Sequence, residues 1–176
     1  MRGVRAIRTA GAGPVTRRDE SPHLRGMHFE KRTRIEAPAS VVFAFHERPD
    51  ALQRLTPPWE KMDIVQPPAS LAVGTIVKLS AHVGPLRVPI VAEHVAYDPG
   101  RSFTDRMVKG PFPSWLHHHR IVPDGERASY LVDDVTYALP LGRLGAIVAG
   151  GAVRRRLERM FAYRHEVTRA ACEGER

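Results

Sequence analysis

Residues 103–137 read FTDRMVKGPFPSWLHHHRIVPDGERASYLVDDVTY, and this stretch decides the fold. It contains three runs in which every second residue falls on one largely apolar face, as in strands, where successive side chains point to opposite faces of a sheet. The runs are separated by KGP at 109–111 and PDG at 123–125, and these residue types favour turns. The stretch therefore predicts three consecutive antiparallel strands.

The apolar face of these three runs carries ionisable side chains in its middle. Its members are Phe103, Asp105 and Met107, then Trp115, His117, His119 and Ile121, then Leu131, Asp133, Val135 and Tyr137. A core face that holds histidines and aspartates indicates either a buried hydrogen-bonded network or polar groups on the wall of a binding site.

The two turns determine which of these residues meet. If the first turn centres on its proline, Asp105 faces His117. If the second turn centres on its glycine, Asp133 also faces His117, which predicts a row Asp105–His117–Asp133 across the sheet. An error of two residues in either turn would place His119 in one of the pairs. Opposed residues have Cβ atoms ~5 Å apart, so hydrogen bonds within such a row are expected.

Composition and charge narrow the function classes. The chain has 176 residues, which suits about one domain, and a formal net charge of +8. Residues 1–26 hold six arginines against two acidic residues, so they carry half of that excess without any apolar periodicity. We interpret residues 1–26 as a disordered basic tail or a misassigned start before Met27, and residues 27–172 as a single domain. Nucleic acid is not an expected partner.

Cysteine and hydropathy patterns bear on the location of the protein. Cys172 is the one cysteine, so no intramolecular disulfide can form, and a reducing cytoplasm is the expected compartment. No apolar run approaches the roughly 20 residues that a membrane helix needs, so no stable membrane insertion is expected. The sequence leaves the oligomeric state open.

The segments before residue 101 predict a strand, two short helices and three further strands. Residues 28–36 alternate and are highly charged, which is typical of an edge strand. Pro38 favours a helix start, and residues 50–55 form a second short helix that ends before a double proline. Residues 61–66, 75–83 and 86–97 read as strands, the last two joined at Gly84-Pro85.

From Arg143 onward the apolar period becomes that of a helix of roughly 28 residues. An apolar stripe predicts the side that faces the sheet, and the arginines at 154–156 and 159 occupy the other side. The stripe contains Leu144, Ile147, Val148, Gly151, Leu157, Met160 and Phe161. Gly150-Gly151 predicts either a break in the helix, close packing against the sheet, or space left for a ligand.

This order of elements resembles the helix-grip fold of the SRPBCC superfamily, which includes START domains, birch-pollen-type allergens and polyketide cyclases. The segments FTDRMVKGPFPSWLHHHRI, DDVTYALPLGRLG and RRRLERMFAYRHEV look like the bacterial ligand-binding branch related to the cell-division-inhibitor type. The resemblance covers residues 27–170. It implies an α+β fold in which a curved antiparallel sheet of about seven strands wraps around a long C-terminal helix, with two short helices after the first strand.

Several positions carry the family pattern. They are Trp59, Phe103, Asp105, Gly110-Pro111-Phe112, Trp115, His117, His119, Asp133, Tyr137 and Tyr163-Arg164. The chain departs from the pattern at Met107, where the resemblance leads us to expect glutamine.

The resemblance implies that a small hydrophobic or amphipathic molecule binds in an internal cavity between the sheet and the C-terminal helix. The residues expected to line it are Trp59, Phe103, Asp105, Met107, Trp115, His117, His119, Asp133, Val135, Tyr137, Leu157 and Phe161. The alternative is a cyclase or dehydratase that uses acid–base chemistry on a polyketide-like substrate, with His117, His119, Asp105 and Asp133 as candidate catalytic residues. Whether the protein is an enzyme stays open at this point. No nucleophile, phosphate-loop or dinucleotide motif is present, so no cofactor is expected.

The pair of histidines at alternate strand positions, with aspartates nearby, also has the ligand types of a metal site. However, His118 points to the other face, and no further histidine or cysteine lies at a diagnostic spacing. The sequence therefore leads us to expect no metal.

Overall fold

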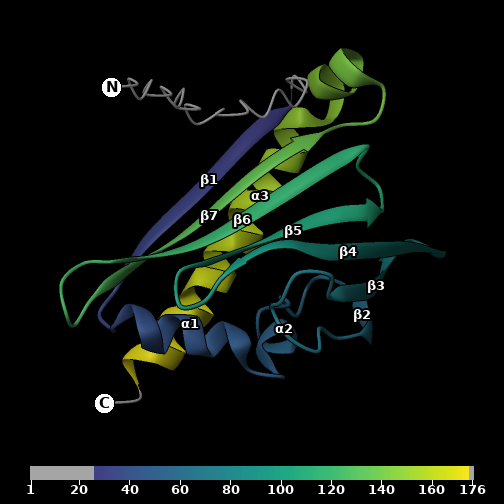
Figure 1. Cartoon of the computed structure of the whole chain (residues 1–176). Helices are drawn as coiled ribbons and strands as arrows, with labels where there is room; N and C mark the ends of the chain where they lie inside the picture. The colour runs from purple at the N-terminus through teal and green to yellow at the C-terminus, as the bar shows by residue number, and fades with distance from the viewer. Residues whose placement is uncertain (1–25, 175–176) are drawn as a thin grey trace, which may run out of the picture.

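The computed structural model describes residues 26–174, in which seven strands form one antiparallel sheet and a long helix crosses it (Figure 1). The strand order in the sheet is β1-β7-β6-β5-β4-β3-β2. The strands are β1 (Met27–Ile35), β2 (Met62–Gln66), β3 (Ile76–Val83), β4 (Leu86–Asp98), β5 (Ser102–Lys109), β6 (Ser114–Pro123) and β7 (Ser129–Ala138), and the helices are α1 (Ala39–Glu47), α2 (Ala51–Arg54) and α3 (Gly142–Glu173). The helix-grip α+β fold is confirmed. The tail or misassigned start expected at residues 1–26 lies outside the described residues, apart from Gly26.

The first strand lies at one edge of the sheet, as its charged alternation predicts. β1 pairs with β7, so strands far apart in the sequence are neighbours, with Met27 opposite Tyr137 and Ile35 opposite Ser129. Phe29 and Ile35 point inward and are buried, whereas Glu30, Arg32 and Arg34 point to the outer face. Burial at every second residue on this strand fixes its register against β7.

Two of the predicted hairpins are confirmed in detail. Val83 pairs with Leu86 across Gly84-Pro85, where Gly84 adopts a positive φ of 58°. Asp105 pairs with His117 between β5 and β6, as expected for a turn centred on the proline.

The register between β6 and β7 differs from the expected one by two residues. Pro123 pairs with Ser129, so His119 rather than His117 lies opposite Asp133. The loop is longer and centred one residue later than the PDG signal suggests, because the amide of Asp124 donates a hydrogen bond of 2.8 Å to the carbonyl of Ala128. The sequence analysis allowed for a shift of two residues in this turn. Because side chains alternate along a strand, such a shift leaves the same side chains on the inner face.

The α1 helix covers one end of the inner face. Its residues Val42, Phe43 and Phe45 pack with strand residues from β1, β5, β6 and β7 into one apolar cluster. Cys172, near the end of α3, is buried in the same cluster. The end of the chain and the first helix therefore close this end of the sheet together.

The second half of α3 packs on the sheet as predicted. Leu157 and Phe161 are buried in an apolar cluster with Phe29, Val135 and Tyr137, while the arginine face of the helix is exposed. Its packing contacts include β1, β7 and α1.

The glycine pair does not break α3, which is continuous from residue 142 to residue 173. The expected interruption is therefore wrong, and the close-packing alternative is confirmed at one of the two positions. Gly150 is buried against Met27, and a Cβ atom added there would lie 3.1 Å from the Met27 Cε atom. At Gly151 the nearest atom, Arg155 Nη1, would be 4.0 Å away.

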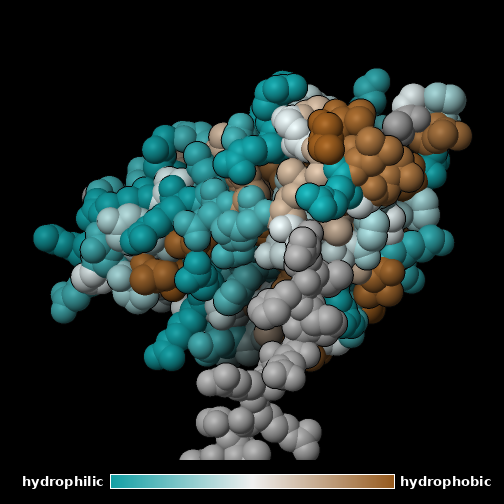
Figure 2. All heavy atoms as spheres, turned by 90° about the horizontal axis from the view of Figure 1, so that it is seen from above, coloured by the Kyte–Doolittle hydropathy of each residue, from teal (hydrophilic) through white to brown (hydrophobic). Residues whose placement is uncertain are grey.

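The start of α3 contradicts the predicted apolar stripe. Leu144, Ile147 and Val148 are 60%, 82% and 77% exposed, so they do not face the sheet. The reason is geometric, because in the described part of the chain the first turns of the helix lie beyond the ends of the strands (Figure 1). In the view from above, hydrophobic side chains gather on this face of the molecule (Figure 2).

Candidate functional site

Two histidines and two aspartates meet on the inner face of the sheet, and we call them the polar cluster: Asp105, His117, His119 and Asp133. His117 and His119 lie at alternate positions of β6, so both rings point inward between the flanking strands. His117 Nε2 donates a hydrogen bond of 3.0 Å to Asp133, and His119 Nε2 donates one of 3.1 Å to Asp105. His117 Nδ1 lies 3.5 Å from Asp105 and His119 Nδ1 lies 2.7 Å from Asp133. Each aspartate therefore contacts both rings.

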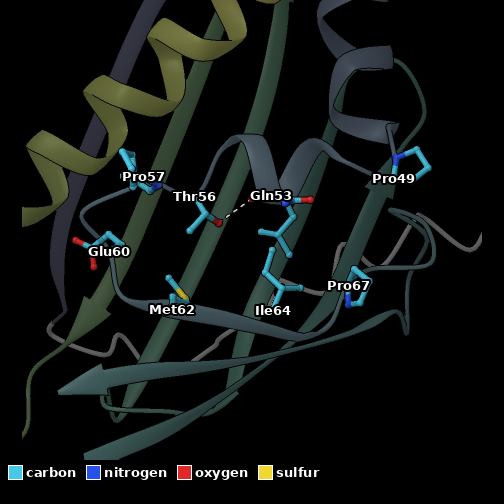
Figure 3. Close-up of a pocket in the computed structure, with 10 residues that line it drawn as sticks. Pro49, Gln53, Thr56, Pro57, Glu60, Met62, Ile64 and Pro67 are labelled. Carbon is cyan, nitrogen blue, oxygen red and sulfur yellow. Dashed lines mark hydrogen bonds between the residues drawn. The ribbon is translucent and has the colours of Figure 1, made fainter. Parts of the chain in front are cut away.

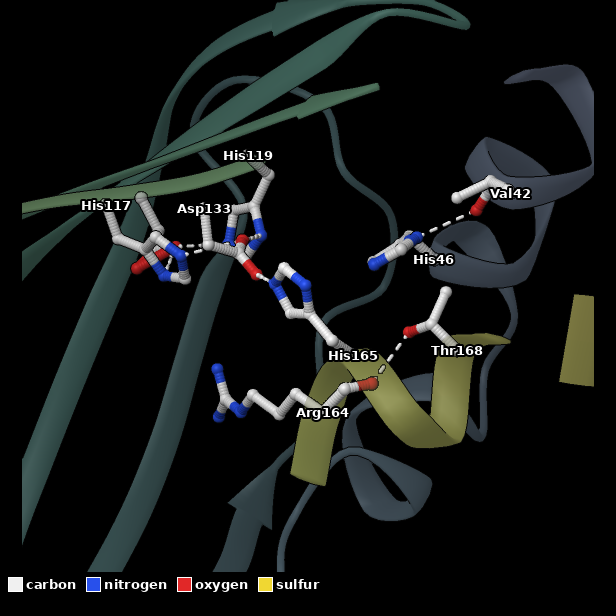
Figure 4. Close-up of polar contacts among 9 residues, drawn as sticks. Val42, His46, His117, His119, Asp133, Arg164, His165 and Thr168 are labelled. Atoms are coloured by element: carbon white, nitrogen blue, oxygen red, sulfur yellow. Dashed lines mark hydrogen bonds and ion pairs between the residues drawn. The ribbon is translucent and has the colours of Figure 1, made fainter. Parts of the chain in front are cut away.

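The helix α3 and the strand β1 extend this cluster. His165 Nε2 donates a hydrogen bond of 2.7 Å to the second oxygen of Asp133 (Figure 4). The other ring nitrogen of His165 accepts a 2.7 Å hydrogen bond from the hydroxyl of Thr33. His165 and Asp133 are both buried, so this chain of hydrogen bonds fixes α3 against the sheet.

Burial and mutual contacts shift the protonation of these groups. Burial lowers the pKa of His117, and the neighbouring His119 lowers it further. Burial also opposes the charging of His119, yet the two carboxylates outweigh it and raise the pKa of His119 to about 9. Although burial alone would raise the pKa of Asp133, the three histidines around it hold that pKa well below its usual range. The cluster thus holds one cationic ring beside one neutral ring.

Two further histidines surround the polar cluster. His46, on α1, donates a hydrogen bond of 2.8 Å to the carbonyl of Val42, and its ring lies 6.4 Å from that of His119. His94, on β4, lies opposite Asp105 in the sheet and is only 4% exposed. Its Nδ1 atom has no hydrogen-bond partner. The ring of Phe103 stacks on His119 at 4.0 Å and closes the apolar side of the group.

Arg164 brings a buried cation to the same region. Its side chain extends from α3 beside the polar cluster (Figure 4), and its Nε atom has no hydrogen-bond partner. Burial lowers the pKa of this guanidinium, while the charges of Asp133, Asp105 and Glu60 oppose that shift. A buried guanidinium that lacks a full set of acceptors is suited to bind an acidic or carbonyl oxygen of a ligand.

Several residues expected to line the site serve instead as packed core. Val135, Tyr137, Leu157 and Phe161 are buried between β7 and α3. Phe103 is buried, whereas Met107 and Trp115 are half-buried. Trp115 packs against the apolar cluster that contains Tyr137.

Trp59 lies apart from the polar cluster. It is 40% exposed, its ring lies 5.2 Å from that of Tyr163, and the guanidinium of Arg159 lies 4.3 Å above it. It lines a charged hollow of about 450 Å³ whose other walls are basic or acidic, including Arg155 and Arg156. The structure therefore does not bring Trp59 together with the other expected ligand-binding residues.

A pocket of about 580 Å³ lies between α2 and the edge strand β2 (Figure 3). Both apolar side chains, among them Leu52, Met62 and Ile64, and polar side chains, Gln53, Thr56 and Glu60, form its walls. Its floor includes Met62 and Ile64, which pair with Ala81 and Leu79 of β3. Cross-strand partners share a face, so this pocket opens on the inner face of the sheet.

The inner face of β3 and β4 continues from this pocket toward the polar cluster. It carries a set of apolar side chains that are half-buried, apart from the buried Val77: Val77, Leu79, Ala81, Val88, Ile90 and Ala92. The next inward residue on β4 is His94, beside the cluster. An apolar surface therefore leads from the pocket to the buried polar groups.

Of the residues that complete this site, the sequence singled out only Arg164, as part of the family pattern and without a role in the site. His94, Arg164 and His165 join the polar cluster from β4 and α3, and Met62 and Ile64 form the pocket floor. One signal was available for His165, because it lies four residues after Phe161 and so falls on the buried side of α3. The pocket gave no such signal, since it depends on how α2 sits over β2.

Together, the antiparallel sheet and the long helix across it define a helix-grip protein, with the polar cluster between them. The chain belongs to the polyketide cyclase/dehydrase and lipid transport family, whose model matches residues 27–172. Members of this family bind hydrophobic molecules in a cavity, and some are cyclases or aromatases. No curated protein matches the sequence.

Solved structures show the same fold at low sequence identity. Norcoclaurine synthase from Thalictrum flavum is 13% identical, with a TM-score of 0.65 over 86% of this chain and 97% of that chain. The Zhui aromatase/cyclase from a Streptomyces species is 20% identical, with a TM-score of 0.57 over 85% and 93% of the two chains. A nucleoside-diphosphate sugar epimerase from Corynebacterium glutamicum is 26% identical, with a TM-score of 0.60 over 80% of this chain but 28% of its own.

None of the described helices combines the length and the apolar composition that crossing a bilayer requires.

Proposed function

We propose that the protein binds a small amphipathic molecule on the inner face of the sheet. The apolar part of the ligand lies in the pocket under α2 and along β3 and β4, and its polar end reaches Arg164 and the polar cluster. A single observation carries this proposal: a half-buried apolar sheet face leads toward the half-buried Arg164, whose buried Nε atom has no hydrogen-bond partner. Family membership supports the same reading.

The size and chemistry of the pocket fit such a ligand. Its volume of about 580 Å³ lies within the ~300–1,000 Å³ range of small-molecule sites. Leu52, Met62 and Ile64 offer apolar contact, whereas Gln53 and Thr56 can form hydrogen bonds. The ligand expected from these walls has an apolar body with few polar atoms along it.

The charges predict the polar end of the ligand. Arg164 interacts electrostatically with Glu60, a pocket residue, and also with Asp105 and Asp133 of the polar cluster. Its guanidinium is therefore close enough to feel the charge of a pocket residue as well as the charges of the cluster. A carboxylate, phenolate or carbonyl oxygen on the ligand would complete its hydrogen bonds, and charge-assisted bonds of this kind are the stronger ones.

Paired fluorescent probes test the proposal. Anilinonaphthalene sulfonate carries an apolar body with an anionic group, and N-phenylnaphthylamine has a similar body without a charge. We expect both to bind, and Arg164→Gln to weaken the anionic probe at least ~10-fold more than the neutral one. Arg155→Gln, on the exposed face of α3, serves as the matched control. Equal effects of the two substitutions would overturn the assignment of Arg164.

The apolar surface has its own test. Ile90→Glu places a charge on the inner face and is expected to weaken both probes, whereas Val91→Glu, on the opposite face, is expected to leave them unchanged. Binding that survives Ile90→Glu would show that the ligand lies elsewhere.

The catalytic alternative rests on the two rings of the polar cluster, because a cationic His119 beside a neutral His117 provides an acid and a base within one site. Native mass spectrometry of the protein from its own host would identify the bound molecule. Recovery of that molecule unchanged after incubation supports binding. If the wild-type protein converts it and His117→Asn binds it without conversion, the protein is an enzyme.

A further inference from the structure

The polar cluster contains three donor atoms at the spacing of a metal site. Asp105 Oδ1 lies 3.1 Å from His119 Nε2 and 3.5 Å from His117 Nδ1. One donor atom from each of these three residues falls within 4.8 Å of the others. Ligands at 2.0–2.1 Å from a tetrahedral ion are ~3.3 Å apart, so two of the three separations already match.

The strands hold these donors rigidly. His117 and His119 alternate on β6, and Asp105 lies directly opposite His117 on β5. Sites on strands of a sheet are positioned more precisely than sites on loops.

The opposite nitrogens of both rings face one shared carboxylate. Asp133 Oδ1 accepts the hydrogen bond from His117 Nε2 and lies 2.7 Å from His119 Nδ1, while its other oxygen is held by His165. Histidines that bind metals almost always direct the outer nitrogen to a carboxylate, carbonyl or water, which fixes the tautomer. Asp133 provides such an outer partner for His117 and lies within contact distance of the outer nitrogen of His119.

The arrangement without an ion leaves one contact unexplained. Because His117 donates from Nε2 to Asp133, the Nδ1 atom of a neutral ring presents a lone pair to the Asp105 carboxylate. His119 Nδ1 approaches Asp133 closely but does not form a hydrogen bond with it. A cation between Asp105 and the two rings would give His117 Nδ1 an electrophile, and it would offset the charge of two enclosed carboxylates.

A fourth group lies beside these donors. His94 faces Asp105 across β4 and β5, is 4% exposed, and has no hydrogen-bond partner for Nδ1. It is therefore available as a further ligand or as a hydrogen-bond partner of a molecule bound to the ion.

We propose that Asp105, His117 and His119 form a binding site for a divalent transition-metal ion of the Zn²⁺ type, with Asp133 orienting both rings. Imidazole and carboxylate ligands suit Zn²⁺, Fe²⁺ and Co²⁺. The sequence led us to expect no metal because His118 faces away and spacing alone offers no further ligand. The fold supplies Asp105 from a neighbouring strand and the outer carboxylate from another. This inference goes beyond ligand binding and does not depend on it.

Metal titration of the untagged full chain tests the site. After dialysis against a chelator, Co²⁺ is added and the visible absorption of the bound ion is followed, and Zn²⁺ binding is measured by calorimetry. We expect one tight site per chain for the wild-type protein. His119→Gln should abolish this site, whereas Asp133→Asn should weaken it ~10–100-fold.

His118→Gln is the matched control, because His118 lies between the two ligands in sequence but on the other face of the sheet. It should leave the affinity unchanged. Equal losses for His118→Gln and His119→Gln, or a wild-type affinity no higher than that of His119→Gln, would overturn the proposal.

A second measurement needs no variant, so it holds even if a substitution prevents folding. Nuclear magnetic resonance of the imidazole nitrogens in the wild-type protein should show Zn²⁺-dependent shifts for His117 and His119 and none for His118 or His82. Shifts at His82 alone would mean adventitious surface binding and would overturn the site. The probe experiments on metal-free protein report separately on the ligand pocket, so the two proposals can fail independently.

Discussion

The two halves of the sheet are built for different purposes. The half formed by β1, β7 and the facing part of α3 is closed: Phe29, Val135, Tyr137 and Phe161 are all buried there. On β3 and β4 the inner face is equally apolar, yet most of its side chains are only half-buried. Buried apolar area stabilises the fold, whereas apolar area left partly exposed beside a pocket is available to a ligand. Stability thus comes mainly from one side of the polar cluster, and the proposed binding surface lies on the other.

The largest expected effect comes from removing an aromatic side chain of the closed half. Phe161 contacts the rings of Phe29 and His117 at 5.2 and 5.1 Å. We expect Phe161→Ala to lower the free energy of unfolding by ~3–5 kcal/mol, measured by urea denaturation. Ile90→Ala, on the half-buried inner face of β4, should lower the free energy of unfolding by about 1 kcal/mol or less. Similar losses for both would mean that the two halves do not differ in packing.

Acid should act on the fold through His46 of α1, whose pKa burial lowers from 6.5 to about 4. The unfolded chain takes up this proton at a higher pH than the folded protein does. Stability should therefore fall as the pH drops from about 6.5 to about 4, by ~3 kcal/mol from this residue. The cationic ring of His119 opposes protonation of His46, and Asp133 favours it.

His46→Leu isolates this contribution, because other buried groups titrate in both proteins. The free energy of unfolding, measured by urea denaturation at several values between pH 4 and pH 7, should change less with pH in the variant than in the wild-type protein. Parallel curves would show that His46 does not stay neutral in the folded state.

A smaller effect locates the point on α3 where the closed half begins. Gly151 has open space around it, so Gly151→Ala should stabilise the protein by ~0.5–1 kcal/mol through helix propensity. Gly150→Ala should gain less, because its new methyl group has to displace the end of Met27. Thermal unfolding of the two variants measures the difference. A larger gain at Gly150 would contradict the packing of α3 on β1.

The smallest effect is expected at the exposed start of α3. Ile147→Ser should change the free energy of unfolding by less than ~0.5 kcal/mol, because this side chain is 82% exposed. A loss comparable to that of Phe161→Ala would mean that these turns pack against part of the protein in solution.

The contrast between local and non-local information explains what the sequence could predict. Asp105, His117, His119 and Asp133 were predicted to share a face because alternation along a strand is a local property. The β5–β6 register followed from a proline turn, whereas the β6–β7 register depended on a hydrogen bond within a five-residue loop.

The rest of the site depends on how elements pack. His165 and Arg164 reach the cluster only because α3 docks on the sheet at one particular rotation. His94 reaches it from β4, whose pairing with β5 contains two register shifts. The same limit applies to the helix stripe. Apolar periodicity continues to the start of α3, but the sheet ends before it does, so the stripe predicted burial where none exists.

The pairing of β1 with β7 has a consequence for synthesis on the ribosome. These strands are ~100 residues apart, so at 5–20 residues per second β1 waits roughly 5–20 s for its partner to be made. In that interval β2 to β6 can form hairpins as they emerge, while β1 remains an unpaired strand. Its outward charges, Glu30, Arg32 and Arg34, disfavour pairing with another chain during the delay. A pause or truncation before residue 142 would therefore leave the hairpins of β2 to β6 formed, while Phe29 of β1 would lack the helix that buries it.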